Sequence, residues 1–231
     1  MVSGPATKAA NTKRVTHLRR QVGAAGLEWI SLEERPITYK ELQKMVRQKR
    51  NEYRRFLGYE RARARRGEPM PLDRARSLLW RYCDSYERLG EVIGYHWIMA
   101  RRPWLKLLGE AWSSVDNIAE WAFELRVLMP ERTCLLMMDQ HERERWRGLP
   151  ARVTIYRGCS PVNATGLSWS LDPAIAAKFP THARYSPPDG QPPQLVTAAV
   201  ARSRIVAVKL DREEDEVITC SARAGAVTTI S

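Results

Sequence analysis

The chain has few of the residues that build metal centres and disulfide frameworks. Its 231 residues include four cysteines and four histidines, with no CxxC pair and no metal-ligand spacing among the histidines. Widely spaced cysteines favour free thiols in a reducing compartment over a disulfide frame or a zinc site. We therefore expect no metal and a cytoplasmic location.

Long apolar runs are also missing from the sequence. No stretch approaches the roughly 20 apolar residues that a membrane helix needs. The first residues lack the apolar core of a secretory signal. From the sequence we therefore expect neither a membrane partner nor a secretory leader.

Positive charge, by contrast, is in excess, with a formal net charge of +12. Residues 1–150 hold 29 Lys and Arg against 19 Asp and Glu, whereas residues 151–231 hold 9 against 7. Such an excess favours contact with nucleic acid, an acidic protein or an anionic surface. The length allows one large domain or two small ones.

The basic excess begins in residues 1–26, whose small, polar and basic composition predicts a flexible tail or a nucleic-acid-binding arm. Thr38 and Glu41 form a capping box that predicts a helix to about Arg66. Its expected buried stripe is Leu42, Met45, Val46, Tyr53, Phe56 and Leu57. Lys44–Arg66 holds ten basic and two acidic residues. This stretch indicates either a solvated face or a surface that docks on nucleic acid or an acidic partner.

Residues 27–148 as a whole are expected to form a helical region. A second long helix is predicted with Asp73 as its cap, ending before Pro103. Shorter helices are predicted over 104–112, 114–128 and 139–147, the last with a cap formed by Asp139 and Glu142. Core positions are predicted for the tryptophans of this region, Trp80, Trp97, Trp104, Trp112 and Trp121.

Beyond Gly148-Leu149-Pro150 the apolar period changes from helical to alternating. Strands are predicted at 152–157, 166–170, 194–200, 204–209, 215–219 and 226–230. Asp172 is expected to cap a short helix with Pro173 at its first position. Residues 181–193 hold four prolines and a glycine, which is typical of a loop.

Three short pieces of this last region carry residues suited to chemistry. Arg157 ends a strand, and the glycine after it, Gly158, lets a ligand approach the backbone; a guanidinium there could bind a pyrophosphate. Ser168 and Ser170 share one face of a strand. Glu214 and Glu216 also share a face, and paired carboxylates suit glycosyl chemistry. Each piece alone is ordinary in a structural role, but the three in this order are not.

Residues 149–231 resemble the ADP-ribosyltransferases of the arginine–serine–glutamate type. The matching segments are Tyr156-Arg157-Gly158, Leu167-Ser168-Trp169-Ser170-Leu171 and Glu214-Asp215-Glu216-Val217-Ile218. The resemblance implies an α+β protein with a basic all-helical N-terminal region before a compact, split antiparallel β-sheet core. It departs from the family at Trp169, where threonine is usual, and in the short spacing of Arg157 and Ser168.

The resemblance also implies roles for individual residues. NAD would be the substrate, with Arg157 on its phosphate and nicotinamide-side ribose and Ser168 positioning ribose and glutamate. Glu216 would bind the ribose 2′-hydroxyl and stabilise the cation as nicotinamide leaves, and Glu214 would orient or deprotonate the acceptor. Further cofactor-binding candidates are Ser170, Gly158, Tyr156 and Phe179, with Trp169 as another residue that could flank the nicotinamide.

The function expected from this resemblance is mono-ADP-ribosylation of a macromolecule, with protein arginine favoured and nucleic acid possible as acceptor. A bacterial or phage protein acting as toxin, defence factor or host-modifying enzyme fits it, in the host cytoplasm if phage-encoded. Alternatives are a nucleic-acid-binding or phage structural protein with an inert domain, an NAD glycohydrolase, and a relative of the compact enzymes that act on RNA 2′-phosphates.

Overall fold

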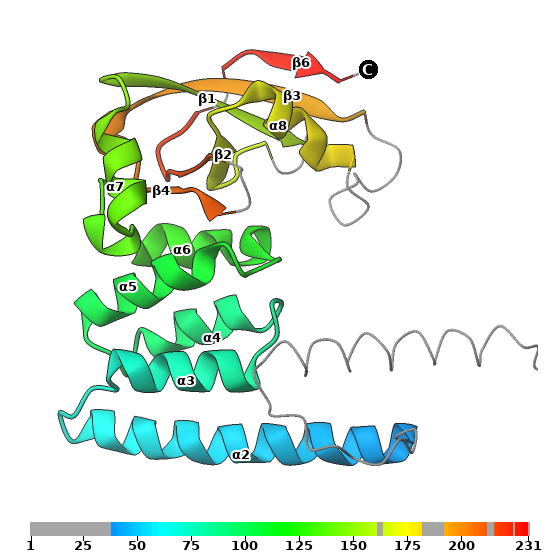
Figure 1. Ribbon diagram of the computed structural model, residues 1–231, viewed down its shortest axis with the longest axis vertical. Helices are drawn as coiled ribbons and strands as arrows, with labels where there is room; N and C mark the ends of the chain where they lie inside the picture. The colour runs from blue at the N-terminus through cyan, green and yellow to red at the C-terminus, as the bar shows by residue number, and fades with distance from the viewer. Residues whose placement is uncertain (1–37, 161–163, 182–191, 212–214, 224, 231) are drawn as a thin grey trace, which may run out of the picture. The chain divides into compact units, whose positions relative to one another are not determined.

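The computed structural model of the protein describes residues 38–160, 164–181, 192–211, 215–223 and 225–230 (Figure 1). The chain divides into two compact units, Met1–Asp84 and Ser85–Ser231. Within the described residues no helix is long and apolar enough to cross a membrane.

The described part of the first unit is a pair of helices, α2 (Tyr39–Arg65) and α3 (Leu72–Tyr82). The predicted capping box is confirmed, because the Thr38 hydroxyl accepts a bond from the Glu41 amide and the Glu41 carboxylate accepts one from the Thr38 amide. Tyr53 stacks on Tyr82 of α3 with ring centroids 5.5 Å apart. The second half of α2 therefore carries the contact with α3.

The predicted buried stripe of α2 is wrong in its first half. Met45 and Val46 are 50% and 36% exposed, whereas Tyr53 and Leu57 are buried. The helix α3 has 11 residues against 27 in α2, so it can cover only part of the longer helix.

The second long helix predicted from the sequence, from Asp73 to before Pro103, is not continuous. Its first part is α3 of the first unit, and the second unit begins with a separate helix. The chain leaves helical geometry at Cys83 and resumes it in α4 (Arg88–Tyr95). Cysteine, aspartate and serine at 83–85 are all weak helix formers, and the last two favour turns. The prediction that Pro103 ends a helix is also wrong, because α5 (Arg101–Trp112) begins there. Proline is tolerated in a first turn, where amide groups have no helical acceptor.

After α5 come η1 (Ile118–Trp121), α6 (Ala122–Leu128), η2 (Leu135–Met137) and α7 (Gln140–Arg147). The predicted Asp139–Glu142 cap of α7 is confirmed. Trp104 and Trp112 are fully buried as expected, but Trp97 is 78% exposed and Trp80 37% exposed, so the core prediction was wrong for those two. The residues around Trp97 form turns rather than helix, which removes the helical face that the prediction assumed.

A six-stranded antiparallel sheet completes the second unit, in the order β4-β5-β2-β1-β3-β6. The strands are β1 (Arg152–Cys159), β2 (Ser168–Ser170), β3 (Gln194–Ala201), β4 (Ala207–Lys209), β5 (Glu216–Ile218) and β6 (Val227–Thr229). Each predicted strand position is occupied. Helices and an antiparallel sheet together make the protein α+β, as predicted.

The helix between β2 and β3, α8 (Pro173–Lys178), is capped by Asp172, whose carboxylate accepts a bond of 2.7 Å from the Ala174 amide. The predicted cap is therefore confirmed. A 3-10 turn, η4 (Phe179–Thr181), follows α8 directly, and both pack on β1. A further 3-10 turn, η6 (Arg202–Arg204), follows β3.

The helices from α4 to α7 belong to the same compact unit as the sheet. The expected division at residues 148–149 therefore does not coincide with the border between the units. The physical reason lies in the packing, because α7 lies on β4 and α5 reaches β5 through the Trp112 side chain. This arrangement brings helical side chains to the strands that carry the predicted motifs.

Candidate active site

The strand register places one residue from each of the three motif segments in a row across the sheet. Tyr156 of β1 is opposite Ser170 of β2, Ser170 is opposite Glu216 of β5, and Glu216 is opposite Lys209 of β4. Residues directly opposite on antiparallel strands point to the same face and lie about 5 Å apart. One face of the sheet therefore presents Tyr156, Ser170, Glu216 and Lys209 in sequence.

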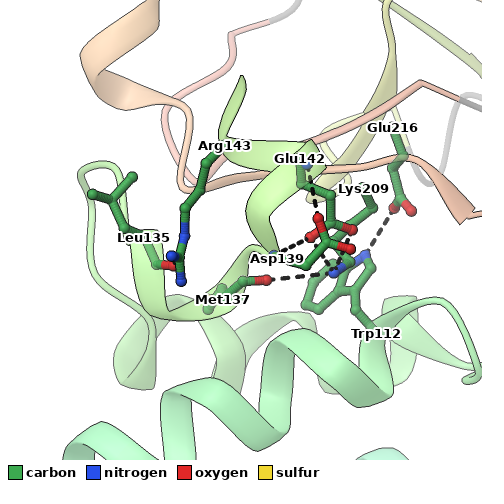
Figure 2. Close-up of polar contacts among 8 residues, drawn as sticks. All are labelled: Trp112, Leu135, Met137, Asp139, Glu142, Arg143, Lys209 and Glu216. Atoms are coloured by element: carbon green, nitrogen blue, oxygen red, sulfur yellow. Dashed lines mark hydrogen bonds and ion pairs between the residues drawn. The ribbon is translucent and has the colours of Figure 1, made fainter. Parts of the chain in front are cut away.

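Glu216 is held by donors from two sides. The indole Nε1–H of Trp112, at the end of α5, donates to the Glu216 Oε1 at 2.8 Å (Figure 2). The Ser168 hydroxyl of β2 donates to the same oxygen. Hydrogen bonds to a carboxylate are stronger than those between neutral groups. The half-buried Glu216 carboxylate thus has a fixed orientation.

Arg157 of β1 bonds to β2 at the point where the two halves of the sheet meet. One half is β4-β5-β2, the other is β1-β3-β6, and the register joins them through the single pair Tyr156–Ser170. The Arg157 guanidinium donates to the Ser168 carbonyl oxygen, so a side chain reinforces this short junction. Burial lowers the pKa of Arg157 below its ordinary value, and the charge of Glu216 opposes that shift. Arginine stays protonated in proteins, so this junction holds a largely buried cation.

The three predicted residues therefore converge. Arg157 contacts the Ser168 backbone, and Ser168 contacts Glu216 through its hydroxyl, although Ser168 and Glu216 are 48 residues apart. The site lies where β2 joins the two halves of the sheet. An arginine, a hydroxyl and a carboxylate in one connected chain can bind an anionic group and a sugar hydroxyl of the same ligand.

Two glycines, Gly158 and Gly166, permit close packing near the site. A Cβ on Gly166 would overlap the Arg157 guanidinium, so a larger residue there would displace this side chain from its present position. A Cβ on Gly158 would overlap the backbone carbonyl of Ala176 in α8. The close approach that Gly158 permits is therefore that of a helix, where the sequence had suggested a ligand.

The last residue of the row, Lys209 of β4, forms a buried ion pair with Glu142 of α7. The Lys209 ammonium lies 2.8 Å from a Glu142 carboxylate oxygen and donates to the Met137 carbonyl at 3.4 Å (Figure 2). The Glu142 carboxylate also accepts the Asp139 amide at 2.8 Å, as part of the cap. Lys209 is only 5% exposed. The lysine opposite Glu216 is thus neutralised from the helical side.

The remaining predicted residues have varied positions. The Ser170 hydroxyl accepts the Asp172 amide at 3.0 Å, which places it at the start of α8. Tyr156 is half-buried in the row, and Phe179 is half-buried in η4, which packs on β1. Trp169 is buried and donates its indole N–H to the Gly166 carbonyl at 2.9 Å. Glu214 lies outside the described residues.

Sequence reasoning missed Trp112, Gly166 and Arg126. Arg126 of α6 donates to the carbonyls of Thr165 and Cys220, and so holds the segments before β2 and after β5. Trp112 and Arg126 belong to the helical region, where nothing in the sequence linked them to residues 39 to 104 positions later. Gly166 could have been noticed, since it precedes the serine strand directly.

Comparison of the chain with protein-family models, with curated proteins and with solved structures found no match. Among the described residues, no group of three or more His, Cys, Asp or Glu side chains could hold a metal ion. A functional proposal for this chain therefore rests on the geometry of the site together with the motif resemblance.

Proposed function

We propose that the protein is a mono-ADP-ribosyltransferase that transfers ADP-ribose from NAD to a macromolecule and releases nicotinamide. The observation that carries this proposal is the hydrogen-bonded chain from Arg157 through Ser168 to Glu216. It joins the three motifs of the resemblance at the junction of the two half-sheets. The fold of that family is part of the same proposal.

The fixed carboxylate suits the chemistry of the reaction. As the bond between the ribose C1′ and the nicotinamide nitrogen breaks, its electron pair leaves with nicotinamide and positive charge develops on the ribose. A carboxylate already oriented by Trp112 and Ser168 stabilises this charge without reorganising. The acceptor nucleophile then forms a bond to C1′ and loses a proton to a base, a role proposed for Glu214.

Arg157 has two roles in this proposal. Its bond to the Ser168 carbonyl aligns β2 with β1, and its positive charge attracts the NAD pyrophosphate. Ser168 holds the Glu216 oxygen and lies beside the ribose, and Glu216 accepts the ribose 2′-hydroxyl. Tyr156, Ser170 and Phe179 are proposed to line the nicotinamide side, and Gly158 to bring α8 close to β1.

The acceptor in this proposal is a protein arginine, with nucleic acid as a further possibility. In the family that the chain resembles, a glutamate at the Glu214 position commonly accompanies arginine acceptors. Hydrolysis of NAD with water as acceptor uses Glu216 in the same way, so the acceptor must be measured.

The test is transfer of label from adenylate-labelled NAD to the proteins and nucleic acids of a cell lysate. The proposal predicts labelled protein with wild type and with Glu131→Gln, an exposed control carboxylate paired with Arg204. It predicts no labelling with Glu216→Gln. Nicotinamide release without labelled macromolecule would indicate hydrolysis instead, and neither product from a folded chain would overturn the proposal.

A further inference from the structure

The first unit has a feature that the proposed enzyme site does not use. Positions 40, 44, 47, 51, 54, 58, 61 and 65 of α2 follow one another by three or four residues, so they lie along one side of the helix. Six of them are exposed cations, Lys40, Lys44, Arg47, Arg54, Arg61 and Arg65. These six residues form the basic stripe.

The acidic residues of α2 are turned away from the basic stripe. Glu41 closes the capping box with Thr38, and Glu52 is half-buried. The carboxylate of Glu60 is buried and paired with Arg74 of α3 at 3.1 Å. None of the three therefore occupies a stripe position.

The stripe has a cost for the free helix. Like charges three or four residues apart destabilise a helix by a few tenths of a kcal/mol per pair, whereas alternating signs would stabilise it. Lys40–Lys44 and Arg61–Arg65 are such pairs. A row of cations maintained against this repulsion indicates a polyanionic partner.

The residue types in the stripe exclude several classes of polyanionic partner. The two stripe positions without charge are Asn51 and Gly58, so the stripe offers no apolar side chain for the core of a protein interface. It has no aromatic residue on which single-stranded bases would stack. The exposed large apolar or aromatic residues of α2, Tyr39, Met45, Val46 and Tyr59, all lie off the stripe, and Tyr53 and Leu57 are buried, so α2 lacks the continuous apolar face that inserts into a lipid surface.

The dimensions of the stripe fit a duplex. A rise of 1.5 Å per residue makes the distance from Lys40 to Arg65 about 38 Å, close to one turn of B-DNA. We propose that the basic stripe of α2 docks on the phosphates of double-stranded DNA, independently of base sequence.

The test measures binding of the full-length chain to a fluorescent DNA duplex of about 20 base pairs as salt is raised from about 50 to 200 mM. Six phosphate contacts predict a slope of log affinity against log salt of about −5. Reversal of three charges, in Arg47→Glu/Arg54→Glu/Arg61→Glu, is expected to reduce the slope to about −3 and the affinity on the order of 100-fold.

Two further variants control for misfolding of the charge-reversed protein and for the change in net charge. The neutral version, Arg47→Gln/Arg54→Gln/Arg61→Gln, retains good helix formers and should lose the same contacts if the reversed variant fails to fold. The matched control, Arg102→Glu/Lys106→Glu/Arg152→Glu, makes the same change in net charge at exposed residues of the second unit. It should bind DNA nearly as well as wild type.

Equal loss of binding in the control and stripe variants would overturn the proposal, since net charge alone would then explain it. Unchanged binding by a folded stripe variant would overturn it as well. Tighter binding to single-stranded DNA, duplex RNA, polyglutamate or phosphatidylserine vesicles than to the DNA duplex would assign the stripe to that other partner.

Discussion

Trp112 and Glu216, separated by 104 residues, are joined by a hydrogen bond of 2.8 Å from the indole Nε1 to the carboxylate Oε1. The bond connects the end of α5 to the first residue of β5. It makes a helix outside the recognised motif region part of the proposed catalytic site, because the orientation of Glu216 depends on it.

The first prediction concerns this indole. Trp112→Phe keeps most of the buried apolar volume and removes the donor, and a bond to a charged group contributes about 1.5–3 kcal/mol. The turnover number for nicotinamide release should fall about ten- to hundredfold. The matched control is Trp104→Phe, also in α5, which removes a buried indole bond to the Val92 carbonyl of α4. It should lower the melting temperature and leave turnover nearly unchanged; equal effects of the two variants would contradict a special role for Trp112.

A second prediction isolates the Ser168 hydroxyl. Ser168→Ala removes the other donor to Glu216 Oε1 but leaves the carbonyl that binds Arg157. Turnover should fall about tenfold or more, while the fold is retained. Steady-state kinetics with NAD, alongside the exposed control Ser203→Ala, measure this effect. If Ser168→Ala turned over NAD like wild type, the hydroxyl would have no part in positioning the glutamate.

The buried Lys209–Glu142 pair leads to a prediction about stability. Lys209→Met leaves the Glu142 carboxylate buried without its cation, and the loss of one partner of such a pair costs about 3–5 kcal/mol. In Lys209→Met/Glu142→Gln the cost should be smaller, since glutamine leaves no buried charge. Arg204→Met, at the more exposed pair with Glu131, should cost less than about 1 kcal/mol. Urea unfolding measures all three, and similar losses at both sites would contradict the buried pairing.

A further prediction concerns how the free energy of unfolding depends on pH through His96. Burial, and secondarily the charge of Arg101, lower the pKa of His96 below its ordinary value of about 6.5. The unfolded chain then binds a proton at a higher pH than the folded chain. The stability contributed by neutral His96 is therefore present above pH of about 6.5 and is lost as pH falls toward the lowered value.

Urea unfolding of wild type and His96→Gln at neutral and mildly acidic pH tests this effect. Glutamine does not titrate, so the variant should lose less stability than wild type as the pH falls through this window. Equal losses in the two proteins would exclude His96 as a source of the acid sensitivity.

Local sequence signals predicted the local structure well. The capping residues Thr38, Asp139 and Asp172 begin helices as expected, and the alternating segments form strands in the predicted places. These features depend on neighbours within a few residues. The motif order then suggested that Arg157, Ser168 and Glu216 would meet, and the strand pairing brings them together.

The predictions were wrong where long-range packing determines which residues are buried and where a helix ends. Met45 and Val46 have helical apolar spacing, but their exposure depends on the length of α3, which the pattern in α2 does not encode. The break at Cys83 interrupts an apolar period that continues on both sides. Trp112 looked like an ordinary core tryptophan, because burial and hydrogen bonding to a distant glutamate have the same local sequence pattern.

The most direct test of the proposed function is nicotinamide release from NAD by the purified chain, compared with Glu216→Gln and with Glu131→Gln. The account predicts release by wild type and Glu131→Gln and a loss of about a hundredfold or more in Glu216→Gln, which keeps the size of the side chain but not its charge. Release at the wild-type rate by Glu216→Gln, or no release by a folded wild-type chain with any acceptor, would contradict it.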